Sequence, residues 1–249
     1  MKNISLVLVP SAFFLAGAFA LAAPQAVLAA QVSTLEISQK NIALTYPKTV
    51  VELFTSQGCS SCPPSNKLVR DIADTDGLLA LSYSVDYWDY LGWKDTHGSP
   101  TFSERQRDYG KRQFQGQVYT PQIILNGETH AARFKSDQIT QHKLTEDKSG
   151  LVLHRNNAGL NVKAKGLAGT LIEVRYTAGT QSVPVARGEN RGRTITLANV
   201  VTSVKTLGEC DENKVFETVV PPPSDGEGLA ILMQDGKGGP IITAANYTP

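Results

Sequence analysis

The first half of the chain has the hydrophobic pattern of alternating strands and helices. Residues 49–54 form a β-branched apolar run, which predicts a buried strand. Pro63 and Pro64 fit only the first turn of a helix, where backbone N–H groups have no partners within the helix. The apolar stripe of this helix consists of Leu68, Val69, Ile72 and Ala73. Residues 78–85 predict a second strand, so the order indicates a βαβ unit with a parallel sheet.

The pattern continues with a second helix and a hairpin. Residues 101–115 predict a helix that buries Phe102, Gln106 and Tyr109, while its charges from Glu104 to Arg112 form a solvated face. Residues 122–125 predict a strand that ends in the hairpin turn Asn126-Gly127. A return strand and a helix near residues 136–147 complete the unit.

After Gly150 the pattern changes to short apolar runs separated by Gly, Asn and Thr. These runs are 151–155, 160–165, 171–176, 194–201, 229–234 and 241–243. Many short strands without a long helical period are typical of a β-sandwich. The predicted fold class is therefore an α/β domain over residues 30–148, followed by a smaller all-β, sandwich-like domain over residues 149–249.

Residues 1–29 have the pattern of a secretory signal peptide. Lys2 provides the positive end, residues 4–21 are almost entirely apolar, and Ala29 closes a plausible cleavage site. The alternative is a retained membrane anchor, but Pro10 and Gly17 interrupt the apolar run. We therefore expect a periplasmic or secreted protein that has no membrane partner after the signal is removed.

The charge balance argues against a nucleic-acid partner. The chain has 24 Lys and Arg residues and 23 acidic residues, and removal of the signal takes one Lys away. A mature chain without net charge lacks the electrostatic footprint that nucleic acid requires.

The three cysteines include one closely spaced pair, Cys59-Ser60-Ser61-Cys62, at the start of the first predicted helix. The positive end of a helix stabilises a thiolate, so we expect Cys59 at the cap position to attack and Cys62 to resolve the mixed disulfide. Zinc uses the same spacing but needs two further ligands, and the four histidines are scattered. We therefore expect no metal and no cofactor. Cys210 is left as a free or incidental thiol.

Two further positions support redox chemistry at this pair. Glu52 alternates with Val50 and Phe54 on one face of the first strand, and a buried carboxylate there could accept the proton of Cys62. The alternative is a surface glutamate on an edge strand. Thr120-Pro121 precedes a strand, and a cis bond there would leave the Thr120 backbone free to bind substrate. The sequence alone leaves the isomer open.

Two loops are candidates for contact with a substrate or with the rest of the protein. Residues 86–95 place Trp88 and Trp93 at the carboxyl end of the second strand, where they form a substrate groove or pack onto the sheet. Residues 187–193, Arg-Gly-Glu-Asn-Arg-Gly-Arg, bind an anion or, in the interpretation that we favour, form interdomain salt bridges.

Several of these strings resemble a known family. The cysteine pair at a helix start, Pro121 before a strand and the hairpin turn are similar to the thioredoxin fold, in which a cis-proline faces the dithiol and a buried acid precedes it. Glu52 matches that acid only with one inserted residue, and Gly58, Ser60 and Ser61 depart from the thioredoxin motif. Residues 51–64, 86–95, 118–122 and 187–193 resemble an exported thioredoxin-like family catalogued as domain of unknown function 1223 (DUF1223). The resemblance covers nearly the whole mature chain and implies a thioredoxin-like first domain, but no substrate.

Three functions are compatible with these features. The first is a thiol–disulfide oxidoreductase with the catalytic residues Cys59, Cys62 and Glu52, acting on protein or peptide thiols and served by an unidentified redox partner. In this hypothesis Thr120, Pro121, Trp88 and Trp93 bind substrate. The second is a non-catalytic binding protein with a structural disulfide, in which the aromatic loop 86–95 and the β-rich part hold the ligand. The third is a copper-handling dithiol.

Overall fold

The computed structural model describes residues 43–144 and 150–248, which contain three α-helices, one short 3₁₀ turn and twelve strands. The predicted signal peptide, residues 1–29, and the predicted domain boundary at 148–149 lie outside the described residues. The elements are β1 (Ala43–Thr45), β2 (Thr49–Thr55), α1 (Pro63–Ile72), β3 (Leu78–Ser84), η1 (Asp89–Leu91), α2 (Pro100–Gln113), β4 (Gln122–Leu125), β5 (Thr129–Ala131), α3 (Ser136–Gln141), β6 (Leu151–Asn156), β7 (Gly159–Lys165), β8 (Gly169–Pro184), β9 (Thr194–Cys210), β10 (Val215–Val220), β11 (Glu227–Gln234) and β12 (Ile241–Thr248).

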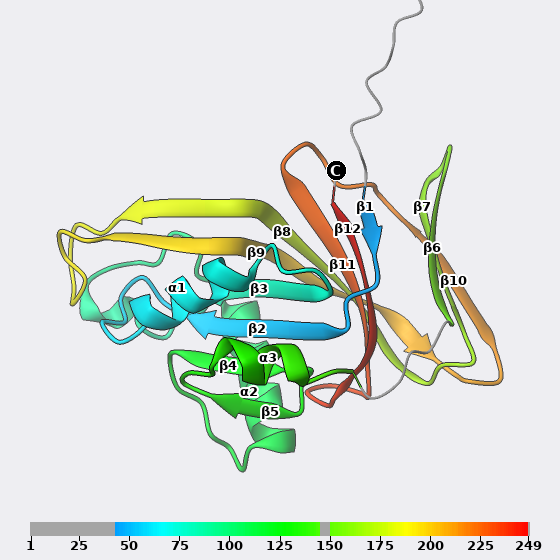
Figure 1. Cartoon of the computed structure of the whole chain (residues 1–249), viewed down its shortest axis with the longest axis horizontal. Helices are drawn as coiled ribbons and strands as arrows, with labels where there is room; N and C mark the ends of the chain where they lie inside the picture. The colour runs from blue at the N-terminus through cyan, green and yellow to red at the C-terminus, as the bar shows by residue number, and fades with distance from the viewer. Residues whose placement is uncertain (1–42, 145–149, 249) are drawn as a thin grey trace, which may run out of the picture. The chain divides into compact units, whose positions relative to one another are not determined.

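Nine of these strands form one mixed sheet in the order β1-β12-β11-β8-β9-β3-β2-β4-β5 (Figure 1). β2 runs parallel to β3 and antiparallel to β4, and α1 connects the parallel pair. The predicted βαβ unit is therefore confirmed. All seven residues of β2 are buried, as expected of a central strand that has hydrogen-bonded neighbours on both sides.

The predicted fold class, a thioredoxin-like α/β domain with a separate smaller all-β domain, is wrong. The chain is mostly β, and β8, β9, β11 and β12 belong to the same sheet as β2 and β3. The connection is the parallel contact of β3 with β9, where Ser82 pairs with Val200. Of the described strands, β10, β7 and β6 form a second, three-stranded sheet. The period of a strand shows which side chains are buried, but it does not show which sheet the strand joins.

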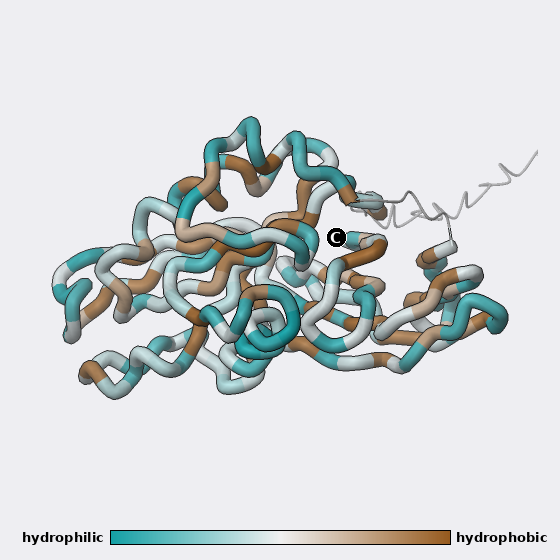
Figure 2. Tube along the Cα trace, turned by 90° about the horizontal axis from the view of Figure 1, so that it is seen from below, coloured by the Kyte–Doolittle hydropathy of each residue, from teal (hydrophilic) through white to brown (hydrophobic). Residues whose placement is uncertain are grey.

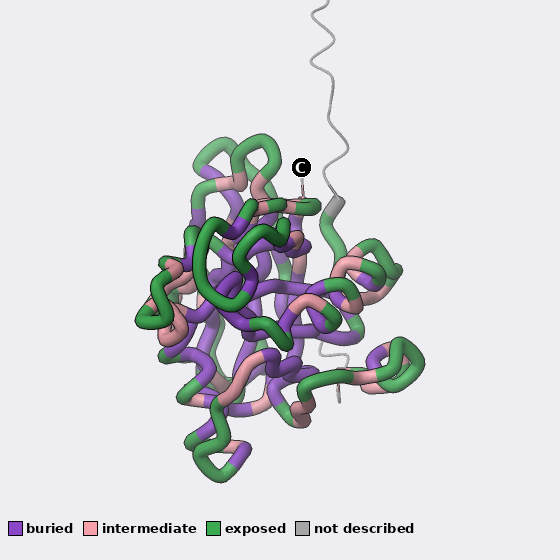
Figure 3. The backbone as a smooth tube through the Cα atoms, turned by 90° about the vertical axis from the view of Figure 1, so that its left-hand side faces the viewer, coloured by how far each residue is buried: buried purple, intermediate pink, exposed green. Residues whose placement is uncertain are grey.

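The two faces of the large sheet are covered differently. On one face α2 packs over a continuous core that runs from Phe54 and Tyr83 to Leu232 of β11. On the other face α1 and α3 cover β2 and β4, while the three-stranded sheet covers β8, β11 and β12. Hydrophobic and hydrophilic stretches alternate along the chain (Figure 2), and the buried segments run through the middle of the described part (Figure 3).

The helices agree with their predicted faces, with one exception. Phe102, Gln106 and Tyr109 of α2 are buried as predicted. Arg105 was expected on the solvated face, but it is only 8% exposed, because it is paired with a carboxylate of β2. None of the described helices has the length and hydrophobicity needed to cross a membrane.

The β8–β9 hairpin is much longer than the predicted strands 171–176 and 194–201. Its strands have 16 and 17 residues, whereas β11 pairs with β8 only from Thr170 to Thr177. The outer part of the hairpin continues past this contact and lies beside α1 (Figure 1). There Arg70 of α1 donates to the carbonyl oxygen of Thr196 at 2.6 Å. The hairpin thus carries its end loop to the first turn of α1.

Candidate functional site

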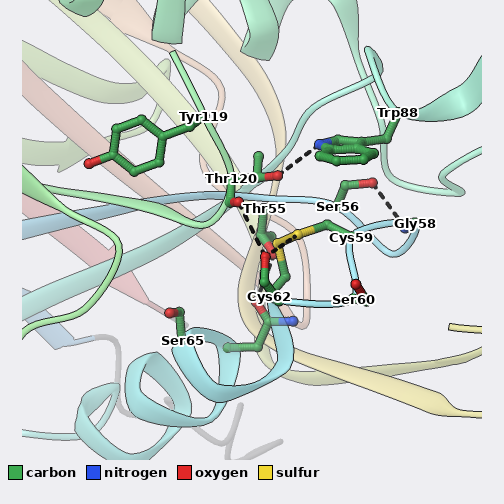
Figure 4. The surroundings of a disulfide bond; sticks show 12 residues. Thr55, Ser56, Gly58, Cys59, Ser60, Cys62, Ser65, Trp88, Tyr119 and Thr120 are labelled. Atoms are coloured by element: carbon green, nitrogen blue, oxygen red, sulfur yellow. Dashed lines mark hydrogen bonds between the residues drawn. A yellow bond between two sulfur atoms is a disulfide. The ribbon is translucent and has the colours of Figure 1, made fainter. Parts of the chain in front are cut away.

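The cysteine pair lies in the connection between β2 and α1 and forms a disulfide, as Figure 4 shows. The Cα atoms of Cys59 and Cys62 are 5.4 Å apart, within the range usual for disulfides. The Cys62 N–H donates to the Cys59 carbonyl oxygen at 3.2 Å, so the four residues close a tight turn. Both cysteines are buried, with 1% and 0% of their surface exposed.

The helix begins directly at the disulfide. Cys62 is the N-cap residue of α1 and Pro63 is the first helical residue, which corrects the prediction that Cys59 occupies the cap. The Cys62 carbonyl oxygen accepts from the N–H groups of Ser65 and Asn66, both at 3.0 Å. The positive end of the helix therefore points toward the sulfur atoms, an arrangement that favours a thiolate after reduction.

The predicted substrate loop lies against this turn. The Thr120–Pro121 peptide bond is cis, which answers the question that the sequence left open. The Ser61 hydroxyl donates to the Thr120 carbonyl oxygen at 3.4 Å and lies 3.3 Å from the Cys59 sulfur. Thr120 is thus opposite the two cysteines (Figure 4).

Both tryptophans of the aromatic loop are at the site, where each uses its indole N–H in a hydrogen bond. Trp88 donates to the Thr120 hydroxyl oxygen at 2.7 Å, and Trp93 donates to the side-chain oxygen of Gln57 at 3.0 Å. Both rings are half-buried. The aromatic loop therefore connects the proline loop with the residues that precede Cys59.

Gln57 and Asp95 were not among the predicted site residues, yet they fix the position of the turn. The Gln57 N–H donates to a carboxylate oxygen of Asp95 at 2.7 Å, and the Asp95 residue is 3% exposed. Burial raises the pKa of Asp95, against the opposing effect of the N–H groups of Gln57 and His97. The sequence contains one indication that Asp95 holds the turn: it is a polar residue within the aromatic loop 86–95.

Glu52 is buried, as predicted for a catalytic carboxylate, and the surface alternative does not apply. Its two oxygens accept from Arg105 at 2.8 and 3.1 Å, and Tyr109 also donates to it. Burial raises the pKa of Tyr109 well above its ordinary value, against the attraction of Arg105, so the phenol remains a donor. Among the hydrogen bonds of the described residues, none joins Glu52 to either cysteine.

The loop at the end of the β8–β9 hairpin covers the disulfide turn. Asn190 is fully buried, and its side-chain N–H₂ donates to the carbonyl oxygens of Gln57 at 2.9 Å and Cys59 at 2.8 Å. The carboxylate of Glu189 accepts from the Ser60 N–H at 3.1 Å. The predicted interdomain salt bridges are replaced by these hydrogen bonds to the backbone of the turn. The expected contact of residues 187–193 with the first part of the chain is therefore present, but it consists of hydrogen bonds from Glu189 and Asn190 and not of salt bridges.

The remaining cysteine is not part of the site. Cys210 ends β9 and is buried in the core under the three-stranded sheet, where burial raises the pKa of its thiol. Within residues 43–144 and 150–248, no three His, Cys, Asp or Glu side chains are grouped as a metal site would require.

Comparison with known proteins places the chain in a family. The family described as "Protein of unknown function (DUF1223)" matches residues 50–234, more than half of the chain. The crystal structure of protein AGR_C_4864 from Agrobacterium tumefaciens is 29% identical, with a TM-score of 0.63 over 82% of this chain and 95% of that chain. HBP35 of Porphyromonas gingivalis is 12% identical, with a TM-score of 0.51 over 81% of this chain and 75% of that chain, which is a likeness of fold only. None of the curated proteins matches the chain. The chain is therefore a member of the DUF1223 family.

Proposed function

We propose that this protein is a thiol–disulfide oxidoreductase that acts on protein or peptide thiols through Cys59 and Cys62. One observation carries the proposal: the disulfide closes the turn before α1 and lies beside the cis Thr120–Pro121 peptide. A helix start favours the thiolate, and an adjacent extended backbone can hold a substrate. In this proposal, the disulfide turn is the redox centre of a mostly β fold.

The proposed exchange balances without a cofactor. A substrate thiolate attacks the Cys59 sulfur, the Cys59–Cys62 bond breaks, and Cys62 leaves as a thiolate that takes up a proton. A second substrate thiolate attacks the substrate sulfur of the mixed disulfide and releases Cys59, which is protonated in turn. Two substrate thiols lose two electrons and two protons, and the protein disulfide gains both. A disulfide on the redox partner accepts the electrons in return, and the reverse sequence reduces a substrate disulfide.

Substitution of single cysteines tests this assignment. We expect Cys59→Ser to abolish exchange with a peptide thiol. With a peptide disulfide as the substrate, Cys62→Ser should accumulate a mixed disulfide on Cys59, because the Cys59 thiolate displaces one peptide sulfur as a thiol and no second cysteine resolves the bond. Cys210→Ser is the matched control, because this cysteine lies in another part of the core, and it should retain exchange. In the reduced protein, Cys59 should react with an alkylating reagent well below pH 8. An ordinary thiol pKa together with a disulfide that does not exchange would overturn the proposal.

A second candidate function is a binding protein with a static disulfide. The observation that favours it is the burial of both cysteines beneath the loop of Asn190. A redox titration against glutathione separates the two functions. A potential above about −200 mV indicates an oxidant or isomerase, whereas one below about −300 mV indicates a structural bridge.

We also propose that the protein is exported to the periplasm or secreted, with residues 1–29 removed. The support is the charged, apolar and small-residue order of the N-terminal sequence. N-terminal sequencing of the protein recovered from the periplasm should begin at Ala30, and recovery of the intact Met1 end in the cytoplasm would contradict this.

A further inference from the structure

Four exposed cationic residues belong to the two loops that contact the disulfide turn, and they have no acidic partner among the described residues. They are Lys94 of the aromatic loop and Arg187, Arg191 and Arg193 of the hairpin loop; we call them the cationic rim. Within the described part of the chain, none of the four forms an ion pair. The Arg193 guanidinium donates to the side-chain oxygen of Asn190 at 3.2 Å, and the Arg193 backbone N–H donates to the Asn190 carbonyl oxygen at 3.0 Å.

The two loops of the cationic rim meet next to Cys59. A side-chain Cβ at Gly188 would lie 3.5 Å from the Trp93 Cβ, so the hairpin loop touches the residue beside Lys94. Asn190 binds the Cys59 carbonyl oxygen, and the adjacent Arg191 continues the same turn. The rim residues are therefore held near the disulfide by contacts of their immediate chain neighbours.

The charge of the cationic rim is a local feature of the protein. Over the whole chain, 24 basic residues are almost balanced by 23 acidic ones. The acidic residues of the same two loops are mostly less exposed: Asp95 is buried, Asp86 and Asp89 are half-buried, and Glu189 is exposed, where it accepts from the Ser60 N–H. The two loops therefore present four exposed cationic side chains and one exposed carboxylate. Charges act over about 8 Å at physiological salt, so an approaching substrate meets this excess of exposed positive charge.

We propose that the cationic rim selects acidic substrates, namely peptides or protein segments whose reactive cysteine is flanked by Asp and Glu. This inference rests on the proposed exchange function and names its substrate class. Arginine forms two-pronged hydrogen bonds with carboxylates, and opposite charge raises the rate of encounter. In the reaction, the substrate thiolate forms a bond to Cys59 while the Cys59–Cys62 bond breaks, and the flanking carboxylates bind the rim.

The test compares three peptides that carry one cysteine each and differ only in their flanks, which are acidic, neutral amide or basic. The measured quantity is the second-order rate of reduction of the Cys59–Cys62 disulfide, scaled for each protein to its rate with uncharged dithiothreitol. We expect the acidic peptide to react at least about tenfold faster than the basic one at low salt. The ratio should fall toward one near 1 M salt, where the screening length is about 3 Å.

Charge-reversal variants locate the effect. Arg187→Glu with Arg191→Glu should invert the order of the acidic and basic peptides. The control, Lys163→Glu with Lys165→Glu, changes the same charge on exposed residues of β7 in the three-stranded sheet and should keep the wild-type order. Equal rates for the three wild-type peptides, with normal reduction by dithiothreitol, would overturn this inference and leave the exchange function intact. Failure of dithiothreitol and of all peptides would overturn both.

Discussion

Asn190 joins the end loop of the β8–β9 hairpin to the backbone of the disulfide turn. Its side chain donates to the carbonyl oxygens of Gln57 and Cys59 and accepts from Arg193. Asparagine suits this position because one amide provides two donors and an acceptor. The two carbonyl groups are in a buried region, where an unpaired polar group is costly.

We predict that Asn190→Ala lowers the free energy of unfolding by about 1–3 kcal/mol, since it leaves these buried groups without their partner. Urea unfolding measures the change. Asn213→Ala is the control, because Asn213 is exposed in the turn after β9, and its effect should stay within about 0.5 kcal/mol. If both variants were equally stable, the Asn190 contacts would contribute little to the fold.

Glu52 and Arg105 form a buried ion pair at the centre of the sheet, with Tyr109 and Gln234 as further hydrogen-bond partners. We predict that Glu52→Leu alone costs about 3–5 kcal/mol, because it leaves the guanidinium buried without a counter-charge. The double variant Glu52→Leu with Arg105→Met should be more stable than Glu52→Leu, because both charges are then removed. Thermal or urea unfolding of the three proteins measures this, and a double variant no more stable than Glu52→Leu would contradict it.

The proton-transfer role of Glu52 requires a separate measurement. If Glu52 accepts the proton of Cys62, the pH profile of disulfide exchange should shift in Glu52→Gln. Arg105→Lys, which keeps the positive charge, is the comparison for a general disturbance of the pair. A profile identical to that of the wild type would show that Glu52 only supports the structure.

At the scale of elements, the outer part of the β8–β9 hairpin is an arm that covers the disulfide. Val185, Ile195, Leu197 and Val200 form its small core with Trp93 packed against them. We predict that replacing residues 185–193 by Asn-Gly, a two-residue hairpin turn, speeds reduction of the disulfide by dithiothreitol. The variant loses the two hydrogen bonds of Asn190, which contribute about 0.5–1.5 kcal/mol each. This loss corresponds to a reduction rate that is roughly tenfold higher.

The matched control for this replacement shortens the exposed turn between β9 and β10, residues 211–214, which lies outside the arm. It should leave the reduction rate unchanged. An unchanged rate in the arm variant would mean that the loop does not restrict access to the sulfur atoms.

The elements that the sequence predicts well are those whose signals are local. The apolar run of β2, Pro63 at the start of α1 and the Asn126-Gly127 turn each depend on a few adjacent residues, and the turn has the expected positive φ angles of 50° and 70°. The cysteine pair belongs to this class. The partners that complete the site are distant: Arg105 follows Glu52 by 53 positions, and Asn190 follows Cys59 by 131. No period or spacing in one sequence encodes such pairings.

At the scale of the whole molecule, one sheet unites the two parts that the sequence pattern separates. β9 lies between β8 and β3, so the strands on either side of residue 148 share hydrogen bonds and a continuous core. Short strands after residue 150 are typical of a β-sandwich, and three of them do form a separate small sheet. The other strands extend the large sheet. The long strands β8 and β9 contribute to both the core under α2 and the core under the three-stranded sheet.

This continuity predicts that the described residues unfold as one cooperative unit. Two probes report on the two parts: both tryptophans, Trp88 and Trp93, lie before residue 148, and the buried thiol of Cys210 lies after it. In the oxidised protein Cys210 is the free cysteine, so labelling of its thiol and tryptophan fluorescence can be followed across the same urea series.

The two transitions should have the same midpoint, because loss of either part exposes the core that both share. Cys210→Ser controls for labelling at other sites, and it should give no labelling transition. Two separate midpoints would mean that the parts are independent domains, and the arm over the disulfide would then belong to a body that can open by itself.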